Sequence, residues 1–156
     1  MITNIFKNLK EKYSLTEKRF LGIDYGTINI GIAISDVSRS IASPYTTLKN
    51  KSYSILFKEL EQIITEMDVG AIIIGLPLQM NGQEGETAQK VHKFKEELEH
   101  HFPTIDIVLN DERLTSSQSE KMLIRDFDLS RQKRKKILDK VSASYILQNA
   151  LDNMNY

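Results

Sequence analysis

Three carboxylates occupy positions in this sequence where an acid needs a particular reason. Asp24 ends the apolar run FLGID, Glu112 directly follows the segment IDIVLND, and Asp139 lies in a helical pattern near the C-terminus. Counted from Asp139, the positions +4, +7, +8 and +11 are apolar and, at about 100° per residue, share its side of the helix: Ala143, Ile146, Leu147 and Ala150. An acid on such a stripe is costly unless a cation compensates it.

These acids could form a metal site if the fold brings them together. Closely packed carboxylates raise one another's pKa, and a divalent cation relieves that conflict. Oxygen ligands suit Mg²⁺ or Mn²⁺, and two such ions about 4 Å apart can activate water for phosphodiester cleavage. Taken singly, each acid has a plainer explanation, because Asp139 could pair with a nearby lysine and Glu112 could be an ordinary surface charge. The spacing alone leaves both interpretations open.

A dense run of cations precedes Asp139. The stretch RQKRKKILDK (131–140) contains six basic residues and one acidic residue, a net charge of +5 within ten residues. Such a run is most often only the solvated start of a helix. Beside a metal site it fits a contact with the phosphate backbone of nucleic acid, which is independent of sequence and sensitive to salt. The candidate nucleic-acid-binding residues are Arg113, Arg131, Lys133, Arg134, Lys135 and Lys136.

Hydrophobic periodicity predicts the elements that must position these residues. The predicted strands are 20–25, 28–35, 43–48, 69–74 and 105–110, and Pro44 confines the third of them to an edge of the sheet. The predicted helices are 52–67, a segment carrying Val91, Phe94 and Leu98, a helix opened by a capping box at 115–118, and 135–153. A strand meander followed by alternating strands and helices predicts an α/β domain with a mixed sheet.

Composition bounds the class of protein. The 156 residues suffice for one domain, predicted at 20–153, and residues 1–19 are predicted to be an extension, mobile or loosely docked. The absence of cysteine excludes disulfides, thiolate zinc sites and cysteine nucleophiles. The 21 basic and 21 acidic residues cancel, so attraction to nucleic acid must come from a local patch. No apolar run has the ~20 residues of a membrane span, and the N-terminus does not fit a secretory signal, so we expect a cytoplasmic protein.

Four motifs, in order, resemble those of the YqgF family, bacterial proteins similar to Holliday-junction resolvases and also described as pre-16S rRNA nucleases. They are LGIDYGTINIGIAISD, IIIGLPLQMNGQEGETAQKV, NDERLTS and RQKRKKILDKVSASYILQNALD, and the match runs over nearly all of residues 20–152. The resemblance implies a ribonuclease-H-like fold, a five-stranded mixed sheet flanked by helices. It also implies that Asp24, Glu112 and Asp139 bind Mg²⁺ or Mn²⁺ and are the catalytic acids of a nuclease.

The activity implied by the resemblance is processing of the 5′ end of pre-16S rRNA, with pre-ribosomal particles as partners and the protein a monomer or weak homodimer. One alternative is a Holliday junction resolvase acting on branched DNA, and another is a non-catalytic RNA-binding module for ribosome assembly. An ATPase of the actin and sugar-kinase type is disfavoured, because such enzymes close two domains over the nucleotide. One departure from the family is Ile28-Asn29, which replaces a Lys-Arg pair and removes a basic contact near the site.

Overall fold

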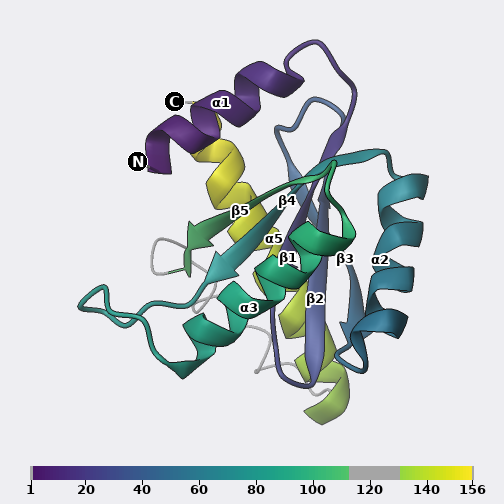
Figure 1. The fold of residues 1–156 in the computed structure, drawn as a ribbon, viewed down its shortest axis with the longest axis vertical. Helices are drawn as coiled ribbons and strands as arrows, with labels where there is room; N and C mark the ends of the chain where they lie inside the picture. The colour runs from purple at the N-terminus through teal and green to yellow at the C-terminus, as the bar shows by residue number, and fades with distance from the viewer. Residues whose placement is uncertain (1, 113–130, 156) are drawn as a thin grey trace.

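One mixed sheet organises the chain, and helices cover both of its faces (Figure 1). The computed structural model describes residues 2–112 and 131–155. The strands are β1 (Arg19–Asp24), β2 (Asn29–Ser35), β3 (Ala42–Lys49), β4 (Val69–Leu76) and β5 (Asp106–Asp111), in the order β3-β2-β1-β4-β5. β1 is antiparallel to β2 and parallel to β4, β3 is antiparallel to β2, and β5 is parallel to β4. The predicted mixed sheet of five strands is confirmed.

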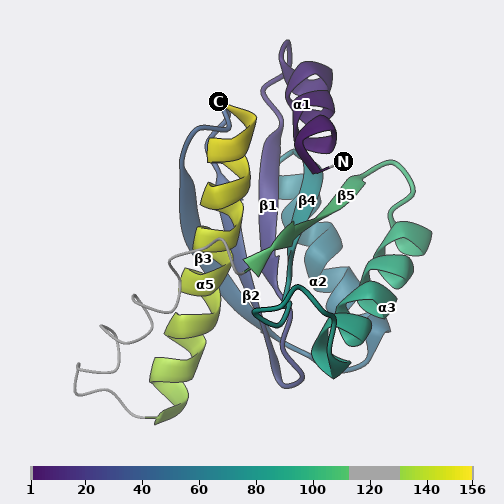
Figure 2. The same cartoon turned by 90° about the vertical axis from the view of Figure 1, so that its left-hand side faces the viewer.

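The helices form a layer on each side of the sheet. They are α1 (Ile2–Tyr13), α2 (Tyr53–Glu66), α3 (Glu86–His101) and α5 (Arg131–Met154). Figure 2 shows α5 on one side of the sheet and α2 and α3 on the other. The helix predicted to begin at 115–118 lies outside the described residues. None of the helices in the described ranges is long and apolar enough to cross a membrane.

The alternation of side chains along the strands divides the core in two. β1 contributes Leu21 and Ile23 to the core beneath α2 and α3, and Phe20 to the core beneath α5. β4 is covered on both faces, with Ile72 in the core beneath α2 and α3 and Ile73 in the core beneath α5. Burial on both faces explains why the sequence of β4 is a continuous apolar run rather than an alternating one.

Glycines allow α5 to approach β1 and β2 very closely. A Cβ atom at Gly22 would lie 2.7 Å from the Cβ of Leu147 and 2.8 Å from the carbonyl oxygen of Ala143. A Cβ atom at Gly31 would overlap the backbone carbonyl of Asp139. The contact at Gly31 joins main chain to main chain, so it fixes the height of α5 above the sheet at Asp139.

α1 belongs to the core beneath α5. Its residues Phe6, Leu9 and Tyr13 are buried, and they pack in the same cluster as Phe20 and Met154. The ring of Tyr13 meets that of Phe20 edge to face, with centroids 5.2 Å apart. α1 therefore covers the end of the sheet opposite to the end of β1 at which Asp24 lies.

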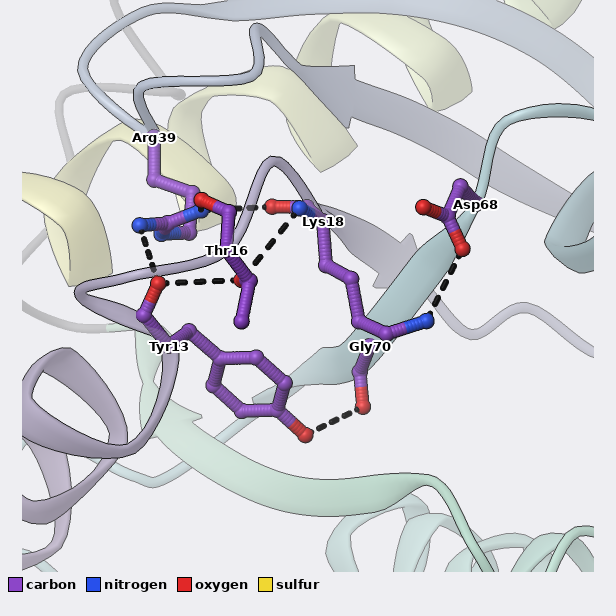
Figure 3. A network of polar contacts seen from close by, with 6 residues as sticks. All are labelled: Tyr13, Thr16, Lys18, Arg39, Asp68 and Gly70. Carbon is purple, nitrogen blue, oxygen red and sulfur yellow. Dashed lines mark hydrogen bonds and ion pairs between the residues drawn. The ribbon is translucent and has the colours of Figure 1, made fainter.

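Polar contacts fix the last turn of α1 (Figure 3). The Tyr13 hydroxyl lies 2.6 Å from the carboxylate of Asp106 and 2.8 Å from the carbonyl of Gly70, and its single proton can be donated to either acceptor. Lys12 Nζ lies 2.7 Å from the same carboxylate. Arg39 donates to the carbonyl of Tyr13 at 2.6 Å, which satisfies one of the acceptors left open at a helix C-terminus. The end of α1 is thereby tied to β4, to β5 and to the connection between β2 and β3.

Gly31→Ala should destabilise the protein, because the added methyl group must displace the backbone of α5 rather than a flexible side chain. We expect the free energy of unfolding to fall by about 1–3 kcal/mol, the usual cost of overpacking, in urea denaturation. Gly85→Ala is the matched control, since the nearest heavy atom to its Cβ position, Nε2 of Gln79, is 3.6 Å away. Equal stabilities of the two variants would contradict the close contact at Gly31.

Asp106 should give the anchoring of α1 a pH dependence. Partial burial would raise its pKa, but hydrogen bonds from Lys12 and Tyr13 together outweigh burial and hold the pKa of Asp106 below its usual value. A lowered pKa in the folded state stabilises the fold above the unfolded pKa of about 3.9, and this contribution is lost as the pH falls further. Asp106→Asn should therefore reduce the free energy of unfolding at about pH 7 and have a smaller effect near pH 3.

Chemical denaturation of wild type and Asp106→Asn at both pH values measures this difference. Glu61→Gln, at an exposed position of α2, is the control for removal of a carboxylate, and it should leave the stability close to that of wild type at either pH. An effect of Asp106→Asn that has the same size at both pH values would show that the charge of Asp106 does not contribute.

Candidate functional site

Asp24 lies at the carboxyl end of β1, on the face of the sheet that carries α5. Residues alternate along the strand, and Gly22, two positions earlier, contacts α5. Asp24 pairs across to Gly31 of β2 in the antiparallel register. Its side chain is half-buried. The apolar run of β1 therefore ends in an acid at the carboxyl end of the central strand, below the part of α5 that contains Asp139.

Two glycines flank Asp24 in the neighbouring strands, and each has another predicted acid above it. Gly31 of β2 lies against the backbone of Asp139. Gly75 of β4 is level with Asp24 in the parallel register, and a Cβ atom there would lie 2.5 Å from Oε1 and 2.9 Å from Cγ of Glu112. The structure thus brings Asp24, Glu112 and Asp139 to one end of one face of the sheet.

These carboxylates offer the oxygen ligands that Mg²⁺ and Mn²⁺ prefer. Glu112 and Asp139 are half-buried like Asp24, and Oδ2 of Asp139 is a buried atom. Within residues 2–112 and 131–155, no group of three or more acidic or histidine side chains has a geometry that could hold a metal ion. The carboxylate oxygens have the donor chemistry that suits a divalent cation. As they are placed within the described residues, they do not form a ligand set for one.

Asn110 is a residue of the site that the sequence analysis missed. It lies in β5 beside Gly75 of β4 and is buried. Its amide nitrogen donates to Oδ1 of Asn149 at 3.0 Å and, more weakly, to the carbonyl of Ile146 at 3.4 Å. This contact ties the end of β5 to α5 and holds the chain that leads into Glu112. In the sequence, Asn110 could have been noticed as a polar residue that directly follows the apolar run 107–109.

The cationic run lies at the start of α5, at the same end of the molecule as the turn between β1 and β2 (Figures 1 and 2). Lys133, Lys135 and Lys136 are exposed, and Arg134 is half-buried. The backbone of this segment is joined to β3, because the Thr47 hydroxyl donates to the carbonyl of Lys136 at 2.7 Å. The predicted contact Arg113 lies outside the described residues, and so does the side chain of Arg131.

The loop after β4 is a short hairpin beside this end of the sheet. Leu78 and Glu84 form an isolated antiparallel bridge, and Gly82 takes a positive φ of 85° at the turn. Nε2 of His92 in α3 lies 2.8 Å from Oε1 of Glu84. The side chain of His92 is thus engaged with the hairpin, and this histidine stands apart from the three acids.

Known proteins and a family model match this chain over most of its length. Residues 18–153 match the family model RuvX, described as Holliday junction resolvase. A protein of Thermoanaerobacter pseudethanolicus named "Putative pre-16S rRNA nuclease" is 48% identical over 135 residues, which cover 86% of this chain and 96% of that protein. A protein with the same name from Endomicrobium trichonymphae is 48% identical over 134 residues, which cover 86% of this chain and 95% of that protein.

Among solved structures, T. thermophilus RuvC in complex with Holliday junction substrate aligns with a TM-score of 0.54. The alignment covers 88% of this chain and 96% of that chain, at 13% sequence identity. At this identity the likeness concerns the fold, and the predicted ribonuclease-H-like fold is confirmed. The family match begins at residue 18, so α1 lies outside it.

Gly75→Ala should move the side chain of Glu112, because the new methyl group would come within 2.5 Å of its Oε1. Its other close neighbour is Cδ1 of Ile146, also the end of a side chain. Since side-chain ends yield more easily than main chain, we expect the free energy of unfolding to fall by about 1 kcal/mol, less than for Gly31→Ala. Urea denaturation of the two variants and a crystal structure of Gly75→Ala test this. A larger destabilisation by Gly75→Ala, or an unmoved Glu112, would contradict it.

Proposed function

The chain belongs to the RuvX family, and from this membership we propose that it is a metal-dependent nuclease that hydrolyses phosphodiester bonds at the 5′ end of pre-16S rRNA. The proposed cofactor is Mg²⁺ or Mn²⁺, and the proposed place of action is the cytoplasm, on RNA within pre-ribosomal particles. Two relatives at 48% identity carry the name of a pre-16S rRNA nuclease, which supports RNA as the substrate.

The observation that carries the proposal is the arrangement of acids around Asp24. Gly31 and Gly75 flank it in the two neighbouring strands, with Asp139 above the first and Glu112 above the second. Carboxylates that approach one another repel, and a divalent cation between them relieves this repulsion. The location of the three acids at one end of one face of the sheet therefore supports a metal-binding role for these residues.

In this proposal Asp24, Glu112 and Asp139 hold the metal from three separate elements of the fold. When bound, Mg²⁺ or Mn²⁺ would supply Lewis acidity at the phosphate and lower the pKa of a water molecule. Asp24 would contribute its carboxylate from the end of β1, Glu112 from the position directly after β5, and Asp139 from the first half of α5. Because water is the proposed nucleophile, hydrolysis needs no covalent intermediate with the enzyme.

The cations at the start of α5 support a polyanionic substrate. The N-terminus of a helix carries a partial positive charge, so cations there disfavour the helix itself. The first turn of α5 contains no acidic residue to offset this effect. Exposed Lys133, Lys135 and Lys136 would be stabilised by phosphate groups, together with the proposed contacts Arg113, Arg131 and Arg134.

Two alternatives would use the same surface. The description of the family model favours cleavage of a Holliday junction, for which a symmetric dimer making paired cuts is expected. The uncharged pair Ile28-Asn29 beside the site favours a module that binds RNA without cleaving it. The three possibilities separate in one assay, because they differ in the molecule that is cut and in whether any cleavage occurs.

Asp24→Asn should abolish cleavage while leaving the fold intact. We expect the cleavage rate to fall at least about 100-fold, roughly 2.7 kcal/mol of transition-state stabilisation, and the stability to remain equal or rise as repulsion is relieved. The assay uses a labelled fragment of the pre-16S rRNA 5′ leader and a four-way DNA junction, each with Mg²⁺, with Mn²⁺ or with EDTA. Asp152→Asn, at an exposed position near the end of α5, is the matched control.

Metal-dependent RNA cleavage that only Asp24→Asn abolishes would support the proposal. Paired cuts in the junction that disappear in the same variant would show that the protein acts as a Holliday junction resolvase. Cleavage that persists in Asp24→Asn would show that the acids are not the active site. Salt-sensitive binding with no cleavage by wild type would favour the non-catalytic module.

A further inference from the structure

We propose that Lys49 and Lys51, at the end of β3, form a second phosphate-binding subsite that extends the cationic surface of α5 toward the turn between β1 and β2. The proposal rests on the proposed function, since it names a further contact for the same nucleic acid. The two lysines would bind the phosphate backbone of the nucleic acid and take no part in the chemistry at the three acids.

The register of β3 places Lys49 on the face of the sheet that carries the acids. Thr47 pairs with Gly31 and donates to the carbonyl of Lys136, so it faces α5. Leu48, the next residue, is buried in the core on the opposite side, with α2. Because side chains alternate along a strand, Lys49 faces the same side as Thr47.

The same register sets the separation between Lys49 and the acids. Asp24, Gly31 and Thr47 lie side by side in β1, β2 and β3, and Lys49 is two residues beyond Thr47. With strands about 4.8 Å apart and about 3.4 Å per residue, the Cα atoms of Lys49 and Asp24 are on the order of 12 Å apart. A flexible lysine side chain at that distance can reach a phosphate next to the one at the acids.

Asn50 holds the segment that carries the two lysines against the turn between β1 and β2. Its backbone N–H donates to the carbonyl of Ile28 at 2.8 Å, and its side-chain amide donates to the carbonyl of Gly26 at 2.8 Å. The N–H of Lys51 donates to the carbonyl of Lys49 at 3.0 Å, which keeps the two residues in one tight turn. Both cations are therefore presented by a fixed backbone.

Within residues 2–112 and 131–155, no carboxylate pairs with the two ammonium groups, which favours binding of an anion. Lys49 and Lys51 are both exposed. Neither forms an ion pair with the described part of the chain, in contrast to Lys12, Lys18 and Lys95, which each lie within 3.0 Å of a carboxylate. The adjoining turn between β1 and β2, residues 25–28, contains no basic residue. Lys49 and Lys51 are thus placed to attract phosphate on this side of an acidic site that repels it.

The test measures binding and cleavage separately in Lys49→Gln/Lys51→Gln. Affinity for the labelled pre-16S leader fragment is measured in EDTA over a range of salt concentrations, and cleavage is measured with Mg²⁺. We expect Kd to rise several-fold to about tenfold, and the slope of log K against log salt to become shallower by about 0.7 for each phosphate of a single strand that the variant no longer neutralises. Lys49→Arg/Lys51→Arg, which keeps both charges, should bind like wild type.

Lys7→Gln is the matched control, because Lys7 is an exposed lysine of α1 at the opposite end of the molecule. Its affinity and salt slope should equal those of wild type. Lys49→Gln/Lys51→Gln with wild-type affinity and slope would overturn the subsite, even where wild type cleaves RNA and Asp24→Asn does not. The two lysines would then serve only to keep an edge strand from pairing with other chains.

The same assay separates this inference from the proposed function. Wild type that cleaves RNA, with weaker and less salt-sensitive binding only in the double Gln variant, supports both. Wild type that binds neither the RNA fragment nor the four-way junction in a salt-dependent manner overturns both. Weaker binding of the junction alone in the double Gln variant keeps the subsite and assigns it to DNA.

Discussion

The contact between the backbone of α5 and the glycines of β1 and β2 is the constraint on which the rest of the structure depends. Gly31 admits the carbonyl of Asp139 at a distance that no other residue type would allow, and Gly22 does the same for the next turns of the helix. The long helix is thereby held at one height and one rotation above the sheet. Its acid, its cations and its apolar side all take their positions from this contact.

The site follows from this contact through the registers of the sheet. The antiparallel pairing of β1 with β2 sets Gly31 beside Asp24, and the parallel pairing of β1 with β4 sets Gly75 on the other side. Acids from distant parts of the chain thus share one end of one face. The same row continues into β3, which explains how Lys49 comes to stand near a site that its own sequence neighbourhood does not suggest.

α1 closes the other end of the same core. Its apolar residues pack on the last turns of α5, and Tyr13 and Arg39 satisfy polar groups of the backbone there. α5 runs from Asp139 near the acids to Met154 beside α1, so one helix connects the two ends of this face. The added helix can stabilise the domain without approaching the site.

The sequence by itself determined the class of fold, the five strands, the end of β1 at Asp24 and the inward side of α5, because hydrophobic periodicity and turn residues are local signals. It also singled out the three acids, with the help of a family resemblance, and their role as catalytic residues stays a prediction. It did not reveal Asn110, the packing of Phe6, Leu9 and Tyr13, or the place of Lys49. Those features arise from strand register and from the contact of distant surfaces, which no local pattern encodes. The tertiary structure alone decided which residues lie side by side, because the glycines that set the height of α5 act only when helix and sheet have met.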